Sequence, residues 1–140
     1  MKKITITTIL TFLLISICSC QENKKSYDES DIIGHWKIDD YLDNTKNINP
    51  QLIEEGKKLA LSTEYIFRKD NTYSMTSPIE DANGTWSYDS ENKVIEMNYS
   101  SKFDENAIEK YEISEFNDDK MVWKTDYEEF GYVEMLVSKK

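Results

Sequence analysis

The feature that most constrains the fold is a regular rhythm across residues 32–138, where short stretches of alternating apolar and polar residues are each followed by a polar turn. Successive side chains of a β-strand point to opposite faces, so these stretches are typical of half-buried strands. Turns as short as residues 69–71 connect antiparallel neighbours, because a parallel crossover needs a dozen residues or more. The predicted strands cover residues 32–42, 63–68, 72–77, 84–88, 93–99, 107–116, 120–125 and 132–138.

A single helix is predicted between the first two strands. Asn49 can cap it, and Pro50 suits its first turn, where the missing N–H costs nothing. Apolar residues then fall near one side, so we expect a helix over residues 50–61, weakened by Gly56. An open eight-stranded meander would leave two unpaired edges, and pairing the first strand with the last removes both. The sequence therefore predicts an all-β fold, an eight-stranded antiparallel up-and-down barrel with one short helix between the first two strands.

The first 20 residues have the layout of an export signal, with two lysines before an uncharged apolar run that ends in two cysteines. Residues 17–20 resemble a bacterial lipobox, in which a small residue precedes the modified cysteine. The resemblance implies lipidation at Cys20. The residues that follow are polar and lack periodicity, so we expect a flexible tether there. The predicted organisation is a lipoprotein signal peptide at 1–20, a flexible tether at 21–31 and a β-barrel domain at 32–140.

Three other arrangements of this segment are weighed against lipidation at Cys20. Modification of Cys18 would place bulky Ile17 just before the cleaved bond, where a small residue is needed. A disulfide between Cys18 and Cys20 would lie inside a removable segment. An uncleaved anchor needs about 20 apolar residues, and this run is at the short limit and diluted by Thr and Ser. Lipidation predicts a location in the bacterial cell envelope, with a lipid anchor in the membrane at the periplasmic face or cell surface.

Acidic residues outnumber basic ones, with 27 Asp and Glu against 17 Lys and Arg and a net charge of -10. A nucleic-acid partner is excluded on this ground, because phosphate backbones bind basic surfaces. Leu, Ile, Val and Phe are few, but Tyr, Trp and Met are spread through the alternating segments and provide a core of large side chains. The acidic outer surface suits contact with a protein partner in the envelope.

No arrangement of residues indicates an enzyme, a cofactor or a metal site. The one histidine, His35, neighbours Trp36 on a strand and therefore faces the opposite side. Carboxylate pairs such as Asp39 and Asp40 point to opposite faces on a strand or lie in solvated turns, which is typical of a solubilising surface. The acidic turn at residues 89–91 lacks the spacing of a calcium loop. We therefore expect no catalytic residues, no cofactor and no metal.

The start of the first strand carries a family resemblance. Gly34, His35 and Trp36 resemble the Gly-x-Trp element of lipocalins, in which the tryptophan closes the barrel floor. The similarity continues through short segments at residues 65–67, 70–73, 84–88 and 94–97. The chain thus resembles the lipocalin-like domains of bacterial lipoproteins, with a calycin-type barrel. The resemblance implies that Gly34 and Trp36 form the barrel floor.

The sequence departs from true lipocalins in two respects. The sole arginine is Arg68, so the late arginine that seals the floor tryptophan in true lipocalins has no counterpart. The C-terminal helix is missing as well. Fatty-acid-binding proteins also begin with Gly-x-Trp, but they need ten strands and this chain has room for about eight.

The alternation places a stripe of large side chains inside the barrel, beginning with Trp36, Ile38 and Leu42 in the first strand. An eight-stranded barrel is only just wide enough to be filled by its side chains or to hold one small ligand. The other inward residues are therefore candidates either for plain core or for a ligand site. The candidate ligand-binding residues are Tyr65, Phe67, Tyr73, Met75, Trp86, Tyr88, Met97, Tyr99, Tyr111, Met121, Trp123 and Met135.

Two functions follow from these alternatives. In the first, a cell-envelope lipoprotein holds a small apolar or amphipathic ligand in the barrel mouth, with the helix at residues 50–61 as a lid. Tyrosine recurs on five predicted strands where a purely structural core could use aliphatic residues, which favours this function, and the lipocalin resemblance implies the same. In the second, the barrel is filled and acts as a protein–protein interaction module in the envelope.

Overall fold

The computed structural model of the protein describes residues 27–101 and 104–140, and its strands form a closed antiparallel barrel. Each strand pairs with the next along the chain, and β1 pairs with β8 to close the sheet. The predicted eight-stranded up-and-down barrel and its helix are confirmed, although the first strand ends three residues later and the fourth begins three residues earlier than predicted. The strands are β1 (Gly34–Thr45), β2 (Glu64–Phe67), β3 (Thr72–Thr76), β4 (Asp81–Asp89), β5 (Val94–Tyr99), β6 (Ala107–Asn117), β7 (Lys120–Asp126) and β8 (Gly131–Lys139).

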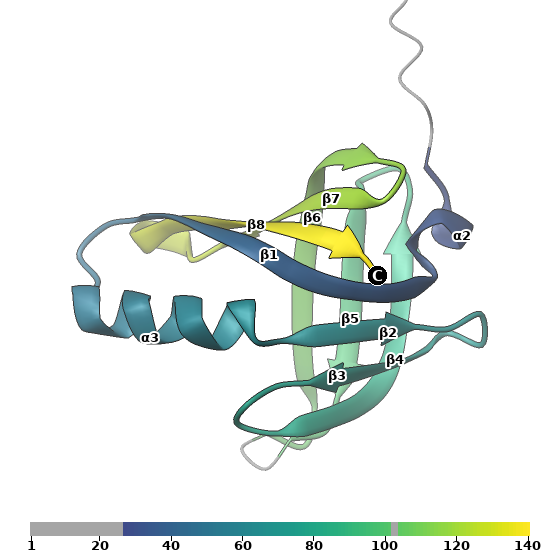
Figure 1. Cartoon of the computed structure of the whole chain (residues 1–140), viewed down its shortest axis with the longest axis horizontal. Helices are drawn as coiled ribbons and strands as arrows, with labels where there is room; N and C mark the ends of the chain where they lie inside the picture. The colour runs from purple at the N-terminus through teal and green to yellow at the C-terminus, as the bar shows by residue number, and fades with distance from the viewer. Residues whose placement is uncertain (1–26, 102–103) are drawn as a thin grey trace, which may run out of the picture.

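The up-and-down order gives the barrel two different ends (Figure 1). At the end that we call the floor, the chain enters β1, and short turns join β2 to β3, β4 to β5 and β6 to β7. At the opposite end, the mouth, α3 (Pro50–Leu61) joins β1 to β2, and η1 (Glu128–Phe130) precedes β8. None of the helices within the described residues is long and apolar enough to cross a bilayer.

The helix α3 begins and ends where the sequence predicts. The side chain of Asn49 accepts a hydrogen bond from the Gln51 amide at 2.9 Å, and Pro50 occupies the first turn. The helix lies beside β1 at the mouth (Figure 1). No residue of α3 is fully buried, so this element is attached to the barrel by one partly covered side.

A second short helix, α2 (Glu29–Ile32), closes the floor and was not predicted. The Asp28 carboxylate caps it by accepting a hydrogen bond from the Ser30 amide at 2.8 Å. Ile32 is fully buried, and its carbonyl accepts a hydrogen bond from Trp36 Nε1 at 2.6 Å. Residues 29–31 were expected to be flexible tether, and residue 32 was expected to start the first strand. Both expectations are wrong, because the Asp28 cap and the hydrogen bond from Trp36 hold these residues in a helical turn.

Two bulges change which side chains face inward. The register of β1 against β8 slips between Ile38 and Asp40, which adds one residue and turns Tyr41 toward the core. Leu42 consequently faces outward with 58% of its surface exposed, so its predicted inward position is wrong. A second slip, in β6, likewise turns Phe116 inward.

Aromatic side chains fill the floor half of the barrel. The ring of Phe67 lies 5.0 Å from that of Trp86 and 6.0 Å from that of Tyr73, measured between ring centroids. Trp36 has no exposed surface, and Trp86 Nε1 donates a hydrogen bond to the Arg68 carbonyl at 3.1 Å. Both floor tryptophans therefore bury their rings while their N–H groups remain hydrogen-bonded, which avoids the cost of an unpaired buried donor.

Lys139, at the end of β8, covers the floor tryptophan. Its ammonium lies 5.1 Å from the ring centroid of Trp36 and donates a hydrogen bond to the Asp31 carbonyl at 3.2 Å. Gly34 makes room for this side chain, because its φ is +146° and a Cβ there would lie 2.5 Å from Lys139 Cε. The floor is thus sealed by a lysine through a cation–π contact, where the sequence showed no arginine for that role.

Candidate functional site

The mouth half of the barrel is hollow. A cavity of about 400 Å³ lies between the strands and the inner side of α3. Gly56, Leu59 and Ala60 of α3 form one wall, and inward side chains of β1, β2, β3, β5, β6, β7 and β8 form the others. This volume falls within the range of small-molecule pockets, which is about 300 to 1,000 Å³. The cavity is therefore the candidate functional site.

A carboxylate and two tyrosine hydroxyls meet on one wall of this cavity. The alternation of β6 turns both Glu109 and Tyr111 inward, and β5 contributes Tyr99 from the neighbouring strand. The Tyr99 hydroxyl donates a hydrogen bond to Glu109 Oε1 at 2.7 Å, and the Tyr111 hydroxyl donates to Oε2 at 3.0 Å. Each carboxylate oxygen thus holds one tyrosine hydroxyl in place.

The tyrosines of the cavity stay neutral. Burial, followed by the hydrogen bond to Glu109 and its charge, raises the pKa of Tyr99. For Tyr111, burial is again the largest cause of a raised pKa, followed by Tyr65 and Glu109. Burial and the charge of Glu109 raise the pKa of Tyr65 as well. Neutral hydroxyls next to a carboxylate can bind and orient a ligand, but they supply no phenolate nucleophile at physiological pH.

Trp123 lies beneath this wall, between the cavity and the floor. Its ring stacks on Tyr111 with centroids 5.2 Å apart and meets Tyr65 edge-on at 5.2 Å. The side chain has no exposed surface, and among residues 27–101 and 104–140 no acceptor takes a hydrogen bond from Nε1. An unpaired buried donor costs roughly 1 to 3 kcal/mol. This indole therefore differs from the two floor tryptophans, whose N–H groups are both paired.

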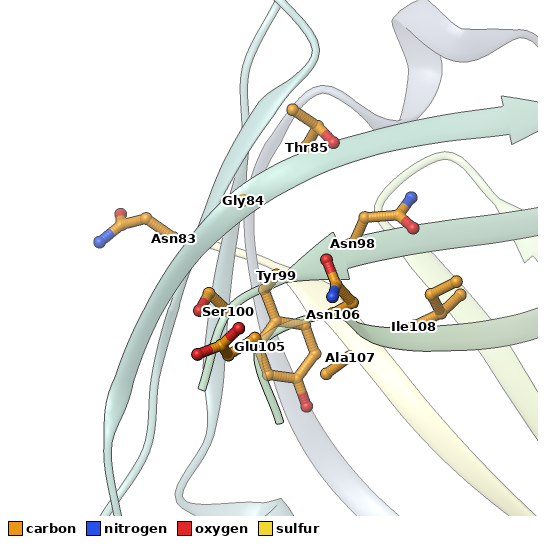
Figure 2. A pocket seen from close by; sticks show the side chains of 10 residues that line it. All are labelled: Asn83, Gly84, Thr85, Asn98, Tyr99, Ser100, Glu105, Asn106, Ala107 and Ile108. Carbon is orange, nitrogen blue, oxygen red and sulfur yellow. The ribbon is translucent and has the colours of Figure 1, made fainter. Parts of the chain in front are cut away.

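A second hollow, of about 410 Å³, lies on the outer side of β4, β5 and β6 (Figure 2). Thr85 and Asn98 are among the residues that line it, and Gly84 allows β4 and β5 to approach each other, since a Cβ there would lie 2.0 Å from the Asn98 carbonyl oxygen. Tyr99 borders this hollow too, but its hydroxyl binds Glu109 inside the mouth. The outer hollow is the more open of the two, whereas the mouth cavity is more enclosed and combines apolar walls with converging polar groups, as ligand sites do.

The sequence of the barrel matches a known family. Residues 32–123 match the family described as Lipocalin-like domain. The chain belongs to this family. The Gly-x-Trp resemblance noted in the sequence is thus confirmed at the level of the domain, and no curated protein matches this lipocalin-like chain significantly.

Solved structures share the lipocalin-like fold at low sequence identity. A lipocalin-like protein from Bacteroides uniformis is 12% identical, with a TM-score of 0.52 and coverage of 79% of this chain and 99% of that chain. A second protein from Bacteroides uniformis, solved by NMR, is 18% identical, with a TM-score of 0.50 and coverage of 78% and 88%. An uncharacterized protein from Bacteroides eggerthii is 14% identical, with a TM-score of 0.50 and coverage of 77% and 98%. These likenesses show the fold alone.

The lipocalin-like barrel divides the predicted ligand-binding residues between cavity and core. Those that line the cavity are Tyr65, Met75, Tyr99, Tyr111 and Met135. Those that belong to the packed core or lie against it, and do not line the cavity, are Phe67, Tyr73, Trp86, Tyr88, Met97, Met121 and Trp123. For the second group a ligand contact stays a prediction, and the structure places these side chains in or against the packed core. Alternation identifies the face that a side chain takes, but not its depth along the barrel axis.

Sequence reasoning missed several side chains of the cavity in this lipocalin-like domain, among them two tyrosines and Glu109. Glu109 lies two residues before Tyr111 on the same face of β6, so the alternation itself could have identified it. Tyr41 could not be found in this way, because the bulge in β1 reverses the alternation. Tyr127 lines the cavity from the connection between β7 and β8, where no periodicity exists.

Residues 27–101 and 104–140 contain no group of three or more His, Cys, Asp or Glu side chains placed to hold a metal ion. His35 does not line the cavity, and its Nε2 lies 2.7 Å from Glu64 Oε2. The expectation that the lipocalin-like protein is not an enzyme stays a prediction. The predicted lipidation site, Cys20, lies outside the described residues.

Proposed function

We propose that the protein is a cell-envelope lipoprotein whose lipocalin-like barrel binds a small amphipathic molecule in the mouth cavity. The observation that carries this proposal is the cavity of about 400 Å³ above a filled floor. Its lining joins apolar side chains to a few converging polar groups, the usual composition of a small-molecule site. A barrel used only as a scaffold gains nothing from this hollow, since empty volume weakens packing.

The helix α3 supports the proposal as a lid over the cavity. Leu59 and Ala60 face the hollow, and no residue of the helix is fully buried. An element with little buried surface opens at a low free-energy cost, so a ligand can pass beneath it. The side chain of Thr63 binds the Leu59 carbonyl at 2.9 Å, which secures the helix end to the start of β2. This end is the expected hinge.

Binding is tested by titrating the full-length protein with the neutral dye N-phenyl-1-naphthylamine and following dye emission. We expect saturable binding to one site. Ala60→Phe puts a ring into the cavity and should weaken binding about tenfold or more, because it takes the volume that the dye needs. Lys58→Phe is the matched control, since it adds the same ring to an exposed position of the same helix and should leave binding unchanged. Equal effects of both variants would contradict the proposed site.

Export and lipidation at Cys20 form the second part of the proposal. The two lysines at the start, the apolar run and the pair Ser19 and Cys20 support it. Intact-mass analysis of protein extracted from membranes should show an acyl-modified chain that begins at Cys20. A chain that keeps Met1 and carries no acyl group would end this part of the proposal, while the binding test above would remain valid.

One observation favours the alternative function, an interaction module in the envelope. An outer groove of about 250 Å³ on β1, β7 and β8 is lined in part by Leu42, Val122 and Leu136. Apolar side chains that gather on the outside of a barrel mark protein contacts when they are continuous. Cross-linking in cells, compared between the natural protein and Leu42→Ser, would detect a partner at this groove. Loss of the cross-linked product in the variant would support the alternative.

A further inference from the structure

The charges that line the mouth cavity all have one sign. Glu80 and Glu109 are its charged lining residues, and no Lys, Arg or His of the described chain is among them. Ligand sites for carboxylates or phosphates place cationic side chains or free backbone N–H groups toward the ligand. The mouth cavity instead presents two carboxylates, although the chain has 17 Lys and Arg residues in all. Its electrostatic character therefore favours a ligand of positive charge.

Glu109 holds this charge at a defined place. The side chain is half-buried, and its oxygens accept hydrogen bonds from Tyr99 at 2.7 Å and Tyr111 at 3.0 Å. In residues 27–101 and 104–140, no cationic side chain forms an ion pair with it. A carboxylate has about four acceptor sites, and the two tyrosines occupy one on each oxygen. The acceptor capacity that remains is available to a donor in the cavity.

Aromatic rings surround the same space. Five tyrosines line the cavity from four strands and one loop: Tyr41, Tyr65, Tyr99, Tyr111 and Tyr127. The negative faces of such rings attract organic cations, and an aromatic cage is the usual way in which proteins recognise alkylated ammonium groups. Burial raises the pKa of each of these tyrosines, so the rings remain neutral. The neutral rings attract a cation, and no lysine or arginine of the described lining repels it.

Several other lining residues are apolar and suit a hydrocarbon part. Ile38, Met75 and Met135 face the cavity beside the tyrosines, and Leu59 faces it from α3. We propose that the cavity selects an amphipathic cation, a molecule with an amine or quaternary ammonium group held near Glu109 and a short apolar part held by these side chains. The inference rests on the binding function proposed above and adds the chemical class of the ligand.

Three probes that share one alkyl chain test the charge of the ligand. Decyltrimethylammonium, decanol and decanoate are titrated into the full-length protein below their micelle concentrations, and Trp fluorescence is followed because Trp123 stacks on Tyr111. We expect the ammonium probe to bind about tenfold more tightly than decanol, and decanoate to bind most weakly. Equal binding of the ammonium probe and decanol, or a preference for decanoate, would overturn the inference while leaving a binding barrel in place.

Variants then assign the preference to the carboxylate. Glu109→Gln should weaken binding of the ammonium probe about tenfold and change decanol binding less than twofold. Glu112→Gln is the matched control, because it removes the same charge from an exposed position on the same strand and should change neither. An ammonium preference that survives Glu109→Gln would overturn the role of this carboxylate.

The remaining outcomes are also decisive. If none of the three probes nor the neutral dye binds, the proposed function fails and the inference fails with it. If Glu109→Gln does not fold, as judged by circular dichroism, the comparison of the three probes in the unmodified protein still decides, because it needs no variant.

Discussion

The floor and the mouth of this barrel are built from the same strands but use their aromatic residues differently. At the floor, Trp36 and Trp86 bury their rings and donate their N–H groups to backbone carbonyls at 2.6 and 3.1 Å. Toward the mouth, Trp123 has no such acceptor among the described residues, and the tyrosines above it turn their hydroxyls to a carboxylate. At the floor, the N–H groups of both tryptophans are hydrogen-bonded within the protein. Toward the mouth, some hydrogen-bonding capacity remains available to another molecule.

The difference shows how a small barrel separates stability from binding. A closed sheet has no edges, so its backbone hydrogen bonds are satisfied along the whole length. Side chains at one end can then interlock to supply most of the free energy of folding, while those at the other end enclose a hollow. The predictions below test this separation by making comparable changes at both ends and measuring the free energy of unfolding with urea.

The largest effect is expected from the floor tryptophan. Trp36→Ala should lower the free energy of unfolding by about 3 to 5 kcal/mol, since a fully buried ring is replaced by a cavity. Met75→Ala, which changes a half-buried side chain at the mouth cavity, should cost only about 1 kcal/mol. Similar losses from both variants would show that the two ends contribute equally to stability.

Two glycine-to-alanine substitutions should change the free energy of unfolding in opposite directions. Gly34→Ala should destabilise the protein by about 2 kcal/mol, because φ is +146° and the new methyl group meets Lys139. Gly56→Ala should instead stabilise it by roughly 0.5 to 1 kcal/mol, because alanine favours the helix and nothing lies within 4 Å of the new Cβ. A destabilised Gly56→Ala protein would mean that α3 is held more tightly than its burial indicates.

Two lysines above aromatic rings give a smaller difference. Lys139→Met should cost about 1 kcal/mol, since it removes the cation–π contact with Trp36 and the hydrogen bond to the Asp31 carbonyl. Lys139→Arg should retain most of this stability. Lys124→Met, near the mouth, removes a cation 4.7 Å from the Tyr132 ring and should cost less than about 0.5 kcal/mol, because that ring is less enclosed. A larger loss of stability from Lys124→Met than from Lys139→Met would show that Lys139 does not seal the floor.

The smallest effect concerns Glu64, a partly exposed carboxylate at the start of β2. Hydrogen bonds from Lys140 and then from His35 lower the pKa of Glu64 in the folded state. Their stabilising effect is therefore present above the unfolded pKa and is lost as the pH falls through the folded pKa. Glu64→Gln should cost less than about 1 kcal/mol at pH 7, since the pair is partly exposed. The difference from the natural protein should shrink as the pH falls below about 4. A difference that persists there would contradict this role of Glu64.

Most of the fold follows from the sequence because alternation and turns are local signals. The helix over residues 50–61 was predictable from Asn49 and Pro50, and the position of Trp36 followed from the Gly-x-Trp resemblance. The outward turn of Leu42 was not predictable, because a bulge is set by the pairing of β1 with β8.

The candidate site was less predictable than the fold. Met97 and Tyr99 share one face of β5, yet only Tyr99 reaches the cavity, since depth along the barrel depends on strand tilt and register. Glu109 carried a usable signal, its place two residues before Tyr111, but a charged residue on an inner face departs from the pattern of apolar inward residues. The contact of Lys139 with Trp36 joins the two ends of the barrel sequence, and no local pattern indicates it.

The place where the chain enters the barrel bears on how a ligand reaches the cavity. The described chain begins at the floor, where the ring of Tyr27 meets that of Phe116 edge-on at 4.2 Å. Cys20 precedes Tyr27 by a stretch that spans at most about 25 Å when fully extended. An acyl group at Cys20, as we propose, would hold the floor against the bilayer and direct the mouth into the aqueous compartment. A ligand would then enter and leave the cavity from the aqueous compartment, and the bilayer would serve only to anchor the protein.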